Sequence, residues 1–186
     1  MTSHPAAPFA YPINAHQYRH GPSGYVDYKS FRPWLRDEFD YRCAYCLFRE
    51  RWCPVLAFHL DHFVAQTVDN SKVTSYRNLL YACPACNTRK SSLPIPSPAK
   101  VFTAEAITIN EDGTVETKTS KARELVRILG LDSPEYNEWR RLMIGIIALA
   151  ASVKRGSRLS LFRELMSYPD QLPDLTRLNP PENYRN

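Results

Sequence analysis

Four cysteines in two pairs are the residues whose types and spacing point most directly to chemistry. They are Cys43, Cys46, Cys83 and Cys86, and 36 residues separate the pairs. Two such CxxC pairs form a closed tetrahedral site of four thiolates, the usual structural zinc arrangement. Because no position stays open for water, we expect structural Zn²⁺ rather than a catalytic ion. Iron in a rubredoxin-like site, or cysteines that share a core by coincidence, are the alternatives.

A second pair of reactive side chains, Asp61 and His62, follows a run of apolar residues. A carboxylate that binds a hard cation, beside an imidazole that accepts a proton, suits metal-assisted hydrolysis of a phosphodiester. Side chains alternate along a strand, so these neighbours share a site only if the strand bends or ends there. The alternative is a surface Asp beside a partly buried His.

The stretch CPACNTRK places an amide and two cations directly after the second cysteine pair. Neighbours on a helix point about 100° apart, so Cys86 can face zinc while Asn87 offers its oxygen to a cation held by Asp61. We expect Arg89 and Lys90 to contact backbone phosphates. An exposed helix residue without a ligand is the alternative for Asn87.

The elements that must position these residues can be read from the hydrophobic pattern. We predict a helix over 28–40, strands over 55–63 and 78–82, and a helix that begins at Pro84. The prolines of residues 93–98 then mark a boundary.

The second half of the chain predicts a hairpin and helices. The hairpin turns at Asp112-Gly113, and helices cover 120–129, 134–155 and 159–167. We therefore divide the chain into a flexible N-terminal arm, a zinc-bearing core, an accessory hairpin with helices, and a tail. The corresponding residues are 1–27, 28–99, 100–170 and 171–186.

Charge and composition limit the class of partner. The 186 residues carry a net charge of +5, and residues 28–99 hold ten Lys and Arg against six Asp and Glu. This basic excess favours a polyanionic partner, with Arg77 among the phosphate contacts. The start of the chain lacks the apolar segment of a signal peptide, and the longest apolar run, 142–151, is too short to span a membrane. We therefore expect a cytoplasmic protein without a membrane partner. Cys53 lies outside the two CxxC pairs, and we expect it to be a buried free thiol.

In combination, the motifs resemble the HNH endonuclease family over about residues 28–92. The pattern is CxxC, Asp-His after a strand, Asn-Leu-Leu, and CxxCN-x-x-K. The resemblance implies an α+β fold with a ββα-metal core, in which a hairpin and a helix hold one divalent cation beside a zinc knuckle. One departure is Ala65, which stands where the family often has Pro.

The resemblance also implies a role for each site residue. Asp61 and Asn87 would bind the cation, Mg²⁺ or Mn²⁺, and His62 would act as general base on the attacking water. Asn78 would orient His62, although a turn amide is the alternative. His59 shares a strand face with Asp61 and has the cation as a possible partner, but we expect an ordinary strand histidine there.

These residues predict a metal-dependent endonuclease acting on DNA, with RNA left open. The alternative is a zinc-stabilised nucleic-acid-binding module without catalysis. A further hypothesis, compatible with the first, is an interaction subunit whose residues 100–170 bind an ATPase of a defence or repair complex. The apolar residues 144–150 fit either a core helix or a homodimer interface.

Overall fold

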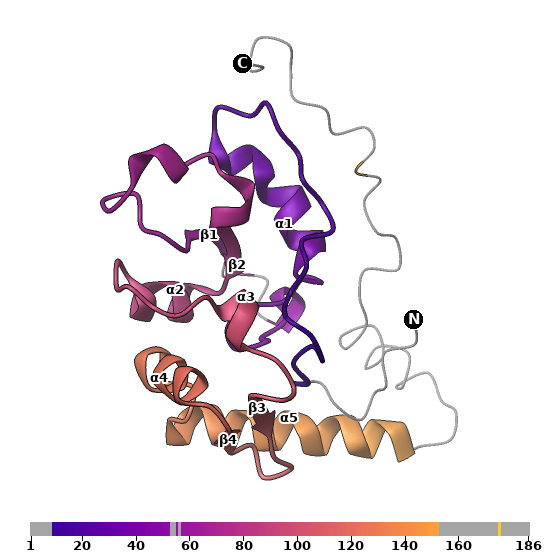
Figure 1. Cartoon of the computed structure of the whole chain (residues 1–186). Helices are drawn as coiled ribbons and strands as arrows, with labels where there is room; N and C mark the ends of the chain where they lie inside the picture. The colour runs from indigo at the N-terminus through magenta and orange to yellow at the C-terminus, as the bar shows by residue number, and fades with distance from the viewer. Residues whose placement is uncertain (1–8, 53–54, 56, 153–174, 176–186) are drawn as a thin grey trace. The chain divides into compact units, whose positions relative to one another are not determined.

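The computed structural model describes residues 9–52, 55, 57–152 and 175 (Figure 1). These residues fall into two compact units. One unit contains residues 17–97, and the other combines residues 9–16 with residues 98–152.

The first unit begins with the helix predicted over 28–40. A 3₁₀ turn, η1 (Tyr28–Phe31), leads directly into α1 (Arg32–Glu38). Pro33 lies in the first turn of α1, where the N–H that proline lacks has no helical acceptor. Leu35 is fully buried, and α1 contacts the second strand of this unit.

The two strands of this unit form an antiparallel hairpin, β1 (His59–His62) with β2 (Leu79–Ala82). Asp61 lies opposite Leu80 in the ladder. All four residues of β2 are buried, so both faces of this strand are covered.

The first strand is shorter than predicted. The sequence predicted a strand from Val55, but pairing starts at His59, and Val55 is 87% exposed. Since β2 provides four residues, only four residues of the first strand find backbone partners. Asn78 also lies outside its predicted strand, at the end of the 3₁₀ turn η4 (Tyr76–Asn78).

The helix predicted at Pro84 is present as α2 (Pro84–Lys90), and it contacts β1. Its N-cap residue is Cys83, and it ends where Ser91 takes a positive φ of 49°. Two shorter 3₁₀ turns, η2 (Glu50–Trp52) and η3 (Asn70–Lys72), lie in the connections. The β1–β2–α2 order confirms the α+β prediction with a ββα core.

Residues 17–27, which the sequence assigned to an N-terminal arm, contact α1 and β2. The Tyr18 hydroxyl donates to the Leu79 carbonyl at 3.1 Å. The Glu38 carboxylate accepts backbone N–H bonds from Arg19 and His20 at 2.7 and 2.9 Å. These bonds tie the segment to the end of α1 that precedes the first cysteine pair.

The second unit contains the predicted hairpin, β3 (Ile107–Ile109) with β4 (Val115–Thr117). Gly113 in its turn has a φ of 83°, and an added Cβ would lie 2.0 Å from a backbone oxygen of Asn137. Only glycine fits this close approach between the turn and the following helix.

Three helices complete this unit. They are α3 (Pro98–Val101), which the sequence did not predict, α4 (Ser120–Leu129) and α5 (Pro134–Ser152). Gly130, in the left-handed conformation, ends α4 as predicted. The helix predicted over 159–167, and the tail over 171–186 apart from residue 175, lie outside the described residues.

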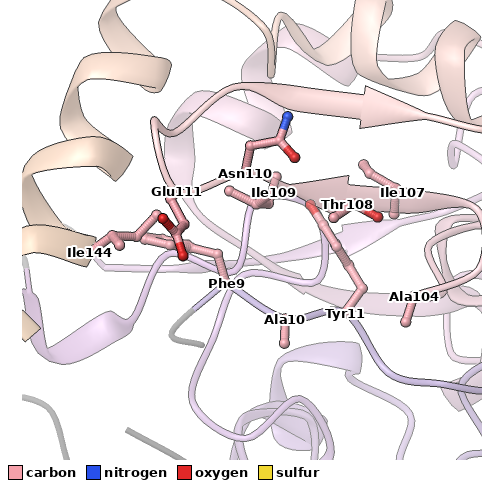
Figure 2. Close-up of a pocket in the computed structure, with 10 residues that line it drawn as sticks. All are labelled: Phe9, Ala10, Tyr11, Ala104, Ile107, Thr108, Ile109, Asn110, Glu111 and Ile144. Carbon is pink, nitrogen blue, oxygen red and sulfur yellow. The ribbon is translucent and has the colours of Figure 1, made fainter. Parts of the chain in front are cut away.

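A cavity of about 310 Å³ opens in the second unit, between residues 9–11, β3 and α5 (Figure 2). Its lining is mainly apolar, with Phe9, Ile107 and Ile144 among the side chains that face it.

Among the described residues, none of the helices has the length and hydrophobicity that a membrane span requires.

Candidate active site and metal centre

The four cysteines of the two CxxC pairs come together in the first unit. Their Sγ atoms all lie within 4.8 Å of one another, all four residues are buried, and 3.7 Å separates the Sγ atoms of Cys46 and Cys83. Four thiolates at about 2.3 Å from one tetrahedral Zn²⁺ would lie about 3.8 Å apart. The cluster therefore has the dimensions of a closed four-thiolate zinc site.

The electrostatics of the cluster favour a cation. Hydrogen bonds from Cys43, Cys46 and Cys86 lower the pKa of the Cys83 thiol, so one negative charge is readily held. Burial raises the pKa of the Cys46 thiol, and the neighbouring thiols raise that of Cys86. Further thiolates in this buried space need a metal ion to offset their charge.

Asp61 is buried, and its carboxylate contacts one residue of the first CxxC segment and one residue of α2. Its Oδ2 accepts a hydrogen bond from the Tyr45 hydroxyl, and its Oδ1 lies 3.0 Å from Lys90 Nζ. Burial raises the pKa of the Asp61 carboxyl, and the Lys90 ammonium opposes that shift. Because Tyr45 stands between the two cysteines of the first pair, the metal centre and the Asp61 carboxylate share one support.

The position of Lys90 differs from the predicted phosphate contact. The residue is fully buried, and its ammonium also donates to the carbonyl oxygens of His62 at 2.7 Å and Ser91 at 3.3 Å. Its three hydrogens are thus matched by three acceptors inside the protein. Lys90 follows Cys86 by one helical turn, so it faces the hairpin rather than solvent. Its role here is to hold Asp61 and the end of β1.

Lys90→Met is expected to lower the free energy of unfolding by about 3–5 kcal/mol, because it leaves the Asp61 charge buried without its counter-ion. Urea denaturation of the zinc-loaded chain measures this change. The exposed neighbour Arg89→Met serves as the matched control and should change stability by less than about 0.5 kcal/mol. The double variant Asp61→Asn/Lys90→Met should recover part of the lost stability. Equal losses of stability in Lys90→Met, Arg89→Met and the double variant would contradict a buried ion pair between Asp61 and Lys90.

His62 is the last residue of β1, and its imidazole points away from Asp61 to a different set of partners. Nε2 lies 2.9 Å from the carbonyl oxygen of Val73. A carbonyl only accepts, so Nε2 carries a hydrogen, and in the neutral form of the ring Nδ1 is then the acceptor. The Gln66 amide nitrogen lies 3.1 Å from Nδ1, and the Tyr28 ring packs edge-on at 4.7 Å. The same Gln66 nitrogen lies 3.3 Å from His62 Nε2, and these contacts together hold the ring in one orientation.

Asn78 fixes the loop that follows β1. Its Oδ1 accepts from the Val64 N–H at 2.8 Å, and its Nδ2 donates to the carbonyls of Val64 and Lys72 at 3.0 and 3.2 Å. The loop that it ties includes Val73, whose carbonyl orients His62. Asn78 therefore acts on the imidazole through the backbone rather than by touching it.

Asn87 contacts the strand pair, as its helix position predicted, but its partner is His59. The Asn87 Nδ2 and His59 Nδ1 atoms lie 2.8 Å apart on the exposed side of the hairpin. Asp61 lies deeper, where Tyr45 and Lys90 take up its carboxylate. The two residues expected to share a cation thus have different side-chain partners in this structure.

A comparison with protein families bears on this ββα unit and its cysteine cluster. Residues 43–93 match the HNH endonuclease family model. The matched range contains both cysteine pairs, β1, β2 and α2, and it assigns a nuclease-type domain to this part of the chain. No curated protein and no solved structure matches the chain.

In the range that matches the family model, Arg77 and Arg89 both have exposed side chains, in η4 just before β2 and in the last turn of α2. Sequence reasoning missed Tyr45, Gln66 and the inward role of Lys90. The position of Tyr45 could have been predicted from its place between Cys43 and Cys46, because a residue inside a CxxC pair lies close to the residues that pack against the metal site. Gln66 had none, since its contact depends on the path of the loop.

Proposed function

We propose that residues 28–99 form a metal-dependent HNH endonuclease that hydrolyses phosphodiester bonds of DNA. The observation that carries this proposal is the contact between His62 Nε2 and the Val73 carbonyl oxygen, at 2.9 Å. This contact leaves Nδ1 as the atom that removes a proton from the attacking water. Gln66, whose side chain is exposed, must release Nδ1 for that water to approach.

The donor set suits a hard divalent cation. Asp61 and Asn87 offer oxygen atoms of the kind that Mg²⁺ and Mn²⁺ accept. Each carboxylate oxygen of Asp61 has a second lone pair beyond the one used by Tyr45 or Lys90. When bound, the cation would stabilise the negative charge that grows on the phosphate and on the leaving oxygen.

The remaining residues of the site position the base and the carboxylate. Asn78 holds the loop that contains Val73. Lys90 binds both the Asp61 carboxylate and the backbone carbonyl of His62. The cysteine cluster, filled by Zn²⁺, braces α2 and Tyr45 and leaves no coordination position for chemistry. The protein would hold two metals with separate tasks.

DNA binding is expected to depend on salt and little on sequence, because Arg77 and Arg89 would contact the phosphate backbone. Arg77→Ala or Arg89→Ala should each flatten the slope of log affinity against log salt by roughly 0.9. Fluorescence anisotropy over a salt series measures the slope. Thr88→Ala is the control and should leave the slope unchanged, because this exposed α2 residue carries no charge. Affinity that does not vary with salt would contradict the proposal.

The substrate class is tested with the zinc-loaded chain and Mg²⁺ or Mn²⁺, on supercoiled plasmid and on single-stranded RNA of similar mass. The proposal predicts open-circular or linear plasmid, with RNA cut more slowly. Binding of DNA without cleavage under either cation would replace it with the binding-module hypothesis. The basic excess of residues 28–99 is common to both functions.

A further inference from the structure

The contact between His59 and Asn87 carries a more specific inference about the catalytic cation. Their nitrogen atoms lie 2.8 Å apart, and the contact is exposed. His59 begins β1, two residues before Asp61, so both side chains project from the same strand face. The face thus presents one imidazole and one amide toward solvent, above a buried carboxylate.

Asn87 can meet the imidazole in two ways. With its NH₂ group toward Nδ1, the amide donates a hydrogen bond, as the structure has it. A half-turn of the amide brings its oxygen to the same place, and two lone pairs then face each other across the gap. That second arrangement is stable when a cation lies between them. Adjacent ligands at about 2.1 Å from an octahedral ion lie about 3 Å apart, close to the separation seen.

The charge of the surroundings decides which cation fits. Asp61 is paired with Lys90, so the carboxylate on this face is largely neutralised. Mg²⁺ depends on negatively charged oxygen ligands and loses its water reluctantly. An imidazole ligand instead favours Mn²⁺, Co²⁺ or Ni²⁺ over Mg²⁺.

We propose that His59 and Asn87 form the outer part of the divalent-cation site, and that this site takes an imidazole-accepting transition metal such as Mn²⁺ in preference to Mg²⁺. The inference rests on the proposed nuclease function and makes it more specific, because it adds His59, a ligand that the family resemblance does not assign. A competing role for His59, as a protonated contact to DNA phosphate, makes a different prediction about metal binding.

The test is to measure Mn²⁺ binding to the zinc-loaded full chain. Electron paramagnetic resonance monitors binding as the loss of the free Mn²⁺ signal. We expect His59→Ala and Asn87→Ala each to weaken Mn²⁺ binding by at least about tenfold. Thr88→Ala, an exposed substitution on the same helix, is the matched control and should bind as the wild type does. Mg²⁺ should displace Mn²⁺ only at a concentration at least about tenfold higher.

The outcomes separate this inference from the proposed function. If His59→Ala binds Mn²⁺ as tightly as the wild type does, or if Mg²⁺ competes equally, the inference is wrong, and plasmid cleavage by the wild type would still support the nuclease. If Mn²⁺ binding requires His59 but the wild type cuts no DNA with any cation, the metal site stands and the nuclease proposal fails.

Discussion

Cys83→Ser is expected to unfold the unit that contains the four cysteines. It should also abolish zinc binding, which we expect to be one ion per chain in the wild type. The substitution removes one thiolate from a buried cluster whose four sulfur atoms lie within 4.8 Å of one another. Structural zinc sites contribute about 10–16 kcal/mol in apparent binding free energy, which exceeds the stability of a typical domain. The loss should therefore appear as aggregation or as the absence of a cooperative melting transition.

Elemental analysis and thermal melting of purified chains measure this effect. Cys53→Ser is the matched control, since the sequence places that cysteine outside the two CxxC pairs, and it should keep both the zinc and the melting temperature. Well-folded wild-type protein that contains iron, or neither metal, would show that the cluster has another role.

The second large effect is expected at His62. His62→Ala should lower the rate of plasmid cleavage by roughly 10²–10⁴-fold, the usual contribution of a positioned general base. The zinc content should not change, because His62 contacts Val73, Gln66 and Tyr28 and not the cysteines. His62→Gln, which keeps more of the side-chain volume, guards against a loss that comes from packing alone.

Asn87→Ala provides the comparison that separates the base from the metal ligand. Its cleavage should also fall, but a higher Mn²⁺ concentration should restore part of the rate, because the defect is one of affinity. No cation concentration should restore His62→Ala, which lacks a proton acceptor. Variants of His62 that fold normally and cleave as the wild type does would contradict the assigned mechanism.

The sequence predicted those parts of the structure that depend on local spacing. The two CxxC pairs, α2 from Pro84 and the end of α4 at Gly130 follow from ligand spacing and helix caps, which leave clear residue signals. Asp61 and His62 were singled out for the same reason, since they are adjacent in the chain, and their catalytic roles stay predictions.

Side-chain direction was less predictable, because it depends on contacts between distant residues. Lys90 looked like a surface cation beside Arg89, yet its long side chain reaches inward to Asp61, 29 positions earlier. A buried carboxylate attracts the nearest ammonium that can reach it, and only the packing of α2 on β1 decides which one does. The contact between His59 and Asn87 has the same origin.

The length of β1 was overestimated for a related reason. The aromatic and branched residues before His59 match strand propensity, but a strand needs backbone partners, and β2 ends at Ala82 opposite His59. Composition therefore predicted the existence of the strand, whereas its limits depended on the partner strand.

The proposed mechanism requires two metals with separate tasks. Its most direct test is the rate of supercoiled-plasmid cleavage by wild-type protein of verified zinc content. The protein is first dialysed to remove weakly bound cations, and zinc is measured again before the assay. We expect no cleavage until Mn²⁺ or Mg²⁺ is added, and then cleavage at an unchanged content of one zinc per chain. Cleavage that proceeds without an added cation, or no cleavage with any cation, would contradict it.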